Sequence, residues 1–477
     1  MLELHDIQGS ILRRNLMPCG TYLFLRIDDA ADGRRWLREL VDPVTSATEW
    51  WEATRTTLNV AFTHAGLAAL GVPISDLEGF PAEFRADIAA RRGKLGDTGE
   101  SSPDRWDRPL GTPDVHALVI LHARDEATLA TECAWHGALL ERTPGVVPVY
   151  EQPVAQLPTR TEHFGYRDGI GEPAIEGSAN PVAPGQGPLL KAGEFVLGYP
   201  DEGGELAPLP RLDLLGRNGS YLVVRKLHQK VAEFRAFLAR ESVKLDGSGQ
   251  PDAVERLAAK LVGRWRSGAP LVLAPDRDDP ELARDHPERL NDFRYRDEDP
   301  KGFRCPKGAH IRRVYPRDAL NLEGGLVNVQ RHRMIRRGLP YGPWLPESAP
   351  DDGVDRGIVF LFIGASIARQ FEFVQEVWIN DGTFAGLGPD KDAVLGANDG
   401  AGTMTIPVKG KIYPKIRGIA RFVTVKGGGY FFLPSIRALG HLATAGAGAA
   451  ERTPRPPSIP PERAITAASI TDPGGPP

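Results

Sequence analysis

His310 stands in a setting that suits a flat, bulky cofactor. Two small residues, Gly308 and Ala309, precede it, and Ile311-Arg312-Arg313 follows at once. A zinc or non-haem iron site needs several protein ligands, and the surrounding sequence supplies no second or third one. Haem needs only one axial imidazole, because the porphyrin fills four positions around the iron. The sequence therefore predicts that His310 binds a haem iron, although a lone histidine is more often a surface or core residue.

Two further stretches combine charged residues with glycines. Residues 162–173 read EHFGYRDGIGEP, and residues 331–342 read RHRMIRRGLPYG. An Asp-Gly pair such as Asp168-Gly169 is usually a turn, so the first stretch alone does not establish a catalytic carboxylate. The second is a basic cluster, and by itself it is equally unspecific.

Taken together, FGYRDGIGEP, CPKGAHIRR and RRGLPYG resemble the dye-decolorizing (DyP-type) haem peroxidases, whose GxxDG element is matched by Gly165 to Gly169. Other segments resemble the same family, among them TTLNVAFTHAGLAALGVP and FLFIGASIARQFEFVQEVW, and the matches span about Leu4 to Ser435 in one order. The resemblance implies an α+β fold of two ferredoxin-like domains (dimeric α+β barrel-like) with haem between them. It also implies one haem b per chain, with hydrogen peroxide and a dye-like reducing donor as substrates.

A haem peroxidase needs an axial ligand, a base that moves a proton between the two peroxide oxygens, and a fixed positive charge. The resemblance assigns these roles to His310, Asp168 and Arg336. Arg336 is preferred to its neighbours Arg331, Arg333 and Arg337 because it lies four residues before Pro340 of the Pro-Tyr-Gly element. An aspartate beside Arg336 should stay ionised to low pH, since an opposite charge favours the carboxylate. An acidic optimum for turnover is therefore expected.

Further residues are expected around the cofactor. Arg313 is predicted to pair with a haem propionate, and Asp392 to accept the second N–H of the axial imidazole. Ile358 and Phe360 share one face of a strand and are expected to roof the pocket. For each of them an ordinary surface, loop or core role stays open. The residues that follow the predicted base are also expected at the cofactor: Gly169, Ile170 and Gly171.

Bulky dyes cannot enter a pocket sized for peroxide, so their oxidation requires electron transfer through the protein or at an exposed haem edge. Tyr341, five residues after Arg336, is a candidate relay. A tyrosine in a Pro-Tyr-Gly turn is more often structural, and that alternative stays open.

The composition is that of a globular protein. The 477 residues are 41% hydrophobic and 25% charged, with a formal net charge of −4, which gives no support for a nucleic-acid or anionic-membrane partner. Three cysteines without a CxxC spacing indicate neither a disulfide framework nor a zinc site. No secretory signal or membrane span is recognisable, so a cytoplasmic location is expected.

Two ferredoxin-like units can be traced in the residue patterns. In the first, strands are predicted at 21–27, 56–63, 115–123 and 146–150, with helices at 28–41 and 126–141. In the second, strands are predicted at 220–227 and 357–364, helices at 230–238, 253–266 and 367–380, and a hairpin at 419–433 turned at Gly427-Gly428-Gly429. The predicted domains are 1–205, which carries GxxDG, and 206–440, which binds haem. A Pro/Ala/Gly-rich flexible tail is predicted at 441–477.

The function predicted from these features is that of a haem peroxidase, which oxidises bulky aromatic or dye-like donors in one-electron steps. Two alternatives remain. A haem-handling (deferrochelatase-like) protein would keep His310 and tolerate loss of Asp168 and Arg336. A ferredoxin-like binding protein without haem would use His310 only structurally. The Soret absorption band of bound haem would exclude the last.

Overall fold

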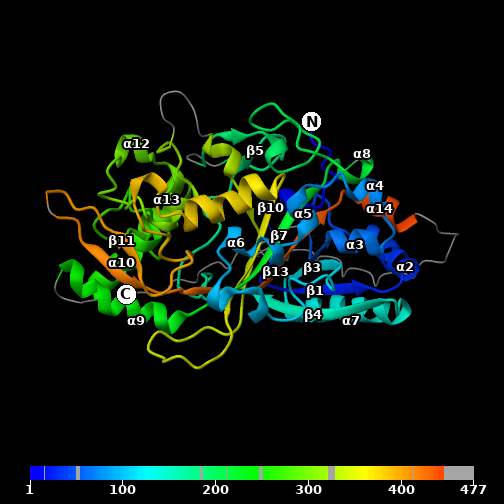
Figure 1. The fold of residues 1–477 in the computed structure, drawn as a ribbon, viewed down its shortest axis with the longest axis horizontal. Coiled ribbons are helices and arrows are strands. Elements are labelled where there is room, and N and C mark those ends of the chain that lie inside the picture. Colours follow the sequence, from blue (N-terminus) through cyan, green and yellow to red (C-terminus); the bar gives the residue numbers. More distant parts are fainter. Residues whose placement is uncertain are drawn as a thin grey trace, which may run out of the picture.

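A computed structural model describes residues 1–14, 17–49, 54–182, 186–210, 212–246, 251–320, 328–410 and 412–444. Within these ranges one twisted antiparallel sheet of nine strands runs through the molecule, in the order β4-β1-β3-β2-β13-β7-β10-β8, with β9 also paired to β10. In Figure 1, β1 and β4 run across the view whereas β7 and β10 stand upright, so the sheet turns between its two ends.

The first half of the chain forms the strands β4-β1-β3-β2. Its elements are β1 (Cys19–Ile27), α2 (Ala30–Val41), β2 (Thr56–Phe62), β3 (Ala117–Ala123), α7 (Glu126–Arg142) and β4 (Val146–Ala155). Strand β3 is buried along its whole length, as its run of apolar residues indicates. Helix α2 begins where Asp29 accepts a hydrogen bond from the N–H of Asp32, and it buries Trp36, Leu37 and Leu40. This strand order is that of a ferredoxin-like unit.

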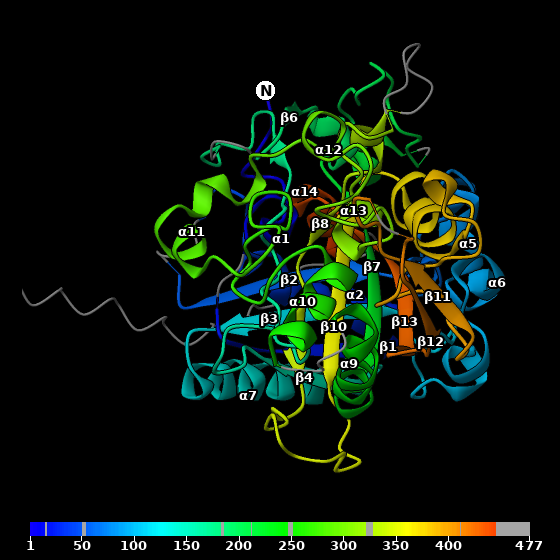
Figure 2. The same ribbon diagram turned by 90° about the vertical axis from the view of Figure 1, so that its left-hand side faces the viewer.

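The second half repeats that order. Its elements are β7 (Ser220–Gln229), α9 (Val231–Asp246), α10 (Pro251–Val262), β8 (Ile335–Arg336), β9 (Leu339–Tyr341), β10 (Gly357–Gly364) and β13 (Val423–Leu433). Figure 2 shows β10, β7 and β13 side by side. The two units join where β2 meets β13, through the pair Phe62–Phe432. The predicted fold class is therefore confirmed.

Shorter elements fill the connections. Those before β7 are α1 (Gly9–Leu12), α3 (His64–Ala69), α4 (Ile74–Leu77), α5 (Ala82–Ala86), α6 (Arg92–Leu95), β5 (Ala174–Ile175), β6 (Leu189–Leu190) and α8 (Asp213–Gly216). Those after α10 are α11 (Pro280–Asp285), α12 (Tyr295–Glu298), α13 (His310–Val314), β11 (Gly402–Thr405), β12 (Lys415–Ile419) and α14 (Ile436–Thr444). The predicted boundary at 205 and 206 falls between β6 and α8 and stays a prediction.

Two predicted elements differ in the structure. The helix at 367–380 is π-helical, in the segments η7 (Ile367–Glu372) and η8 (Val374–Asn380). The predicted hairpin at 419–433 is wrong, because β13 continues through the three glycines while paired to β7, with an irregularity in the pairing between Val425 and Gly427. A Cβ on Gly428 would lie 2.3 Å from the carbonyl oxygen of Val224. Glycine here permits close approach of two strands and does not mark a turn.

The chain's C-terminal part packs back on the first unit. Helix α14 contacts α2, and it includes residues 441–444 of the predicted tail. The rest of that tail, 445–477, lies outside the described residues. None of the helices in the described ranges has the length and apolar character needed to cross a membrane.

We expect Phe432→Ala to weaken the junction of the two units. Phe432 is fully buried and packs edge-on against Phe80 at 5.2 Å between ring centroids. Truncating such a side chain costs about 3–5 kcal/mol, because it leaves a cavity. Chemical denaturation measures this loss, with Ile74→Ala as a control because Ile74 is 75% exposed. Equal stability of the two variants would contradict the prediction.

Candidate active site

A cavity of about 300 Å³ lies against one face of the second unit's sheet. Alternate residues of the strands line it, as the period of two requires: Arg225, Leu227 and Gln229 from β7, Ile358 and Phe360 from β10, Arg336 from β8, and Val423 and Val425 from β13. Ile358 and Phe360 thus share the face that was predicted. Their role as a roof over a cofactor stays a prediction.

His310 faces this cavity as the first residue of α13. Its Nδ1–H donates to Oδ2 of the fully buried Asp392, at 2.9 Å. Oδ1 of Asp392 accepts the N–H groups of Val394 and Leu395, so the carboxylate cannot turn away. Among the described residues the Nε2 atom of His310 has no hydrogen-bond partner. The predicted pairing of His310 with Asp392 is present, and it leaves one ring nitrogen available to a metal ion.

The negative charge of Asp392 strengthens its hydrogen bond with the His310 imidazole. Burial opposes a positive charge on His310, but the neighbouring carboxylate of Asp392 outweighs burial and raises the pKa of the imidazole. A hydrogen bond to a carboxylate also makes a coordinating imidazole a stronger electron donor.

Asp168 and Arg336 meet in the same cavity. The Nη1 atom of Arg336 donates to Oδ1 of Asp168 at 2.7 Å, although 168 residues separate them in sequence. The side chain of Asp168 is 48% accessible and lies on the cavity wall. Partial loss of surrounding water in the cavity would raise the pKa of Asp168, but the charge of Arg336 and the N–H of Gly169 outweigh this effect and lower the pKa below its ordinary value. Asp168 can therefore act as a base in acidic solution.

Glu162 shapes the loop that carries Asp168. Its carboxylate accepts the N–H groups of Phe164 and Tyr166, at 2.9 and 2.7 Å, and a further hydrogen bond from the Gln229 side chain. Gly169, directly after the base, has φ +76°, which a residue with a Cβ rarely adopts. Glu162 was not among the residues predicted from the sequence. Its place directly before the His-Phe-Gly of the motif was the only signal.

Glu172 is a second carboxylate beside Arg336. Its Oε1 lies 3.6 Å from Nε of Arg336, and its Oε2 accepts a hydrogen bond from Arg337 at 2.9 Å. Oε1 is buried and has no hydrogen-bond partner among the described residues. Arg336 is thus shared between two carboxylates, Asp168 and Glu172. Glu172 was likewise not among the residues predicted from the sequence.

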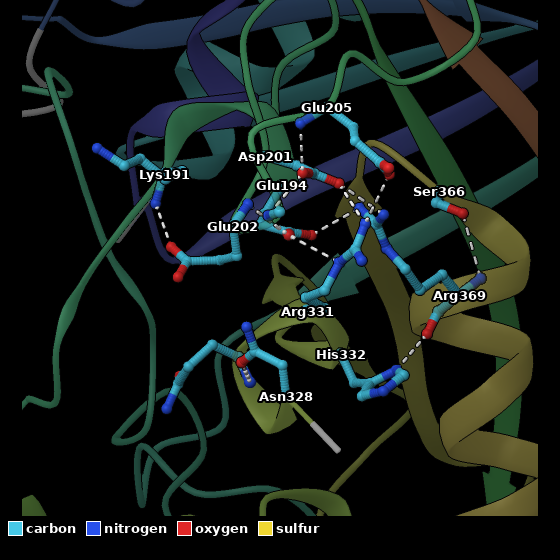
Figure 3. A network of polar contacts seen from close by, with 12 residues as sticks. Lys191, Glu194, Asp201, Glu202, Glu205, Asn328, Arg331, His332, Ser366 and Arg369 are labelled. Atoms are coloured by element: carbon cyan, nitrogen blue, oxygen red, sulfur yellow. Dashed lines mark hydrogen bonds and ion pairs between the residues drawn. The ribbon is translucent and has the colours of Figure 1, made fainter. Parts of the chain in front are cut away.

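The other arginines of the basic cluster have different partners. Figure 3 shows Arg331 and Arg369 around Asp201, with donor to acceptor distances of 2.6 and 2.7 Å. Arg369 also donates to the buried Glu194, at 2.8 Å. This network ties the segment before β8 to the start of the π-helix η7. It therefore supports the strand that presents Arg336, and Arg331 does not line the cavity.

The structure corrects the prediction for Arg313. Its side chain is fully buried, lies outside the cavity lining, and donates to three backbone carbonyl oxygens. Every nitrogen of the guanidinium is therefore engaged within the protein. The predicted contact between Arg313 and a propionate is wrong.

Three other arginines line one edge of the cavity, and we call them the edge arginines: Arg264, Arg317 and Arg333. Their hydrogen bonds go to neutral oxygens, such as Asn291 Oδ1 for Arg264 and Arg317, and the Gly171 carbonyl for Arg333. No ion pair with a carboxylate is found for any of them within the part of the chain that the structure describes.

Burial, helped by the charge of Arg317, lowers the pKa of Arg264 to about 9. Buried cations without a counter-charge are costly, so an anionic group fits this edge. Haem brings two carboxylates and needs one free imidazole. The residues present therefore fit haem.

The remaining predicted residues take separate places. Ile170 and Gly171 line the cavity. Gly169 is not part of the lining, and its N–H donates to Asp168 at 2.6 Å. Tyr341 lies outside the lining, with its hydroxyl donating to Asp355 at 3.0 Å. The relay role of Tyr341 stays a prediction.

This fold and this cavity define a class, the dimeric α+β barrel proteins that bind haem. The model of the DyP dimeric alpha+beta barrel domain matches residues 6–147. A dye-decolorizing peroxidase of Mycena epipterygia is 31% identical over 93% of this chain and 88% of its own length.

Solved structures agree. An ancestral D-type dye-decolorizing peroxidase has a TM-score of 0.80 at 33% identity, covering 92% of this chain and 98% of that one. A fungal DyP-type peroxidase from Auricularia auricula-judae has a TM-score of 0.81 at 28% identity, covering 93% and 100%. The chain belongs to the dye-decolorizing peroxidase family, and it is a haem peroxidase.

We expect Glu172→Gln to shift the pH dependence of the reaction with hydrogen peroxide. Without the negative charge of Glu172, Asp168 is the only carboxylate that pairs with Arg336, so the pKa of Asp168 falls further. The acidic limb of the profile should move to lower pH by about 0.5–1 unit. Stopped-flow rates across pH measure the limb. The control is Glu176→Gln, whose carboxylate is half-exposed and pairs with Lys191. A limb that moves to higher pH would refute the prediction.

Proposed function

We propose that this peroxidase binds one haem b per chain and uses hydrogen peroxide to oxidise bulky aromatic or dye-like donors in one-electron steps. The observation that carries the proposal is the cavity itself, with the free Nε2 of His310 on one wall and the Asp168–Arg336 pair on another. A relative is recorded in complex with 2,6-dimethoxyphenol, which supports phenolic donors. The cytoplasmic location stays a prediction.

In this proposal His310 coordinates the iron through Nε2, and the edge arginines hold the two propionates. Bound haem supplies the iron at which the O–O bond of peroxide is cleaved. Asp168 takes a proton from one peroxide oxygen and returns it to the other. The guanidinium of Arg336 offsets the negative charge that develops on the departing oxygen. Each turnover converts one peroxide into two waters and takes two electrons and two protons from donor molecules.

The size of the donor sets a further requirement. Donors larger than the cavity must lose their electron at the surface of the protein. Tyr341 fits a relay chemically, because the carboxylate of Asp355 can accept its phenolic proton when an electron leaves. Asp355 in turn contacts the buried Lys226 at 3.0 Å and His228 at 2.8 Å, so it stays anionic.

We expect Asp168→Asn to lower the rate constant for reaction with peroxide by about 10²–10⁴, the usual contribution of a positioned base. Arg336→Leu should also slow it and move the acidic limb to higher pH, because the pKa of Asp168 rises without its cation. Both variants should keep the Soret band, which serves as the control for haem content. A haem-handling protein would tolerate both changes, so unchanged peroxide reactivity would favour that alternative.

We expect Arg317→Met to weaken haem binding by the apo-protein by about 2 kcal/mol or more, because a buried carboxylate then lacks its partner. Haem dimethyl ester, which has no free carboxylates, should bind the variant and the parent protein alike. Spectroscopic titration of the apo-protein with each haem measures both affinities. Arg296→Met, at an exposed position, is the matched control. A loss that is the same for the ester would contradict the role of the edge arginines.

A further inference from the structure

We propose that Arg313 is a positioning residue for the axial histidine: it fixes the chain segment that presents Asp392 to His310. The proposal rests on the haem ligation by His310 proposed above. Arg313 lies three residues after His310, within the same short helix α13 (His310–Val314). It therefore joins the histidine and the segment that carries its partner carboxylate.

The contacts of Arg313 all reach that segment. Nε donates to the carbonyl oxygen of Trp378 at 2.6 Å, Nη2 to that of Asp381 at 2.7 Å, and Nη1 to that of Asp390 at 3.0 Å. The guanidinium also lies 4.9 Å from the ring centroid of Phe384. The three guanidinium nitrogens thus bond to three backbone carbonyls within residues 378–390, and the guanidinium also packs on the Phe384 ring.

Two of these carbonyls belong to the end of the π-helix η8. The last carbonyl groups of a helix have no partner within the helix, and a cation near them is favoured by the helix dipole. Trp378 lies in the final turn of η8, and Asp381 directly follows the helix. Buried carbonyl groups need a hydrogen-bond donor. Arg313, which lies on α13, provides one to the C-terminal end of η8.

Asp392 is attached to the same helix end. Its N–H donates to the carbonyl oxygen of Ile379 at 2.9 Å. The chain on which Asp392 lies is thus held at two points: Asp392 itself is bonded to Ile379, and Asp390, two residues before it, is bonded to Arg313. From this position the Asp392 carboxylate contacts His310. If Arg313 were lost, the carbonyl oxygens of Trp378 and Asp390 would lose the donor that Arg313 provides, and that of Asp381 would keep only the N–H of Phe384. The segment would then relax. The distance from Asp392 to His310 would then be held less firmly, by the contacts of Asp392 with Ile379, Val394 and Leu395 alone.

Arg312 provides a matched comparison, because it is buried to a similar degree on the same helix. It donates to Asp299 and to the carbonyl oxygen of Cys305, and it stacks on Tyr295. None of these partners lies in residues 378–392. A loss of Arg312 costs stability but leaves the segment of Asp392 in place.

The expected consequence is electronic. A histidine that donates to a carboxylate becomes a stronger donor to iron and favours the ferric state. Loosening Asp392 should therefore raise the ferric/ferrous reduction potential and lower the iron–imidazole stretching frequency. The potential is read by redox titration of the holoenzyme and the stretching frequency on its ferrous form, so neither readout needs turnover.

The test compares Arg313→Lys, Arg313→Met and Arg312→Met by redox titration and resonance Raman spectroscopy. A lysine keeps the charge, but its single nitrogen cannot occupy three positions. Both Arg313 variants should shift the two readouts toward those of Asp392→Asn, whereas Arg312→Met should keep the parent values. If Arg313→Met does not fold, Arg313→Lys decides. Parent values in the folded Arg313→Lys variant would overturn the proposal.

A double variant separates positioning from general destabilisation. If Arg313 acts through Asp392, adding Arg313→Lys to Asp392→Asn should produce no further shift, since the contact is already lost. A full additional shift would also overturn the proposal. His310→Ala tests the proposed haem ligation separately from the role of Arg313. If the iron–imidazole band survives in His310→Ala, the proposed ligation itself has failed; if it disappears there but is unmoved in the Arg313 variants, only the present inference has failed.

Discussion

The ion pair between Asp168 and Arg336 is the interaction on which the rest of the site depends. It joins the GxxDG loop to a two-residue strand at the edge of the second sheet half. A carboxylate at 2.7 Å from a guanidinium in a recessed site stays ionised in acid, which a proton acceptor for peroxide requires. The pair is useful only if both parts of the backbone are held. Glu162 and Glu172 hold the loop and the arginine, and the Asp201 network holds the segment before β8.

Duplication of one simple topology explains why the cavity lies where it does. Each half has the ferredoxin-like order, and the halves join edge to edge through β2 and β13. Only the second half turns its sheet face to the cavity, with α13 and the π-helix η8 among the surrounding elements. The loop of residues 162–173, which follows the first half, completes the wall. An active site of this kind needs both halves although a single sheet face lines it.

The sequence predicted most of the architecture, because long apolar runs and periodic helices are local signals. The prediction failed at Gly427-Gly428-Gly429, because three successive glycines are typical of a turn. In the structure they allow β13 to approach β7 closely. The sequence-based prediction paired His310 with Asp392 and placed Asp168 beside Arg336, and both contacts are present. Motif position could not reveal the roles of Glu162 and Glu172, because Glu162 is joined to Gln229 and Glu172 to Arg337, which are distant in sequence. Such contacts form only when the chain folds, and residue spacing does not show them.

The arginines near His310 show most clearly what residue spacing alone does not predict. Arg313 was assigned to a propionate because it follows His310 by three residues, yet α13 has only five residues and directs this side chain into the protein. Arg317, four residues further on, reaches the cavity instead.

Charge balance then decides between ligands. Asp168 and Glu172 form ion pairs with Arg336 and Arg337, whereas the edge arginines donate hydrogen bonds to neutral oxygens only. A neutral ligand would cover the edge arginines without offering a negative charge, and burying an unpaired cation is unfavourable. A ligand with two carboxylates at one edge and a metal ion at its centre satisfies the edge arginines and the free nitrogen of His310 together. This is the physical reason to prefer haem over any apolar or uncharged occupant of the cavity.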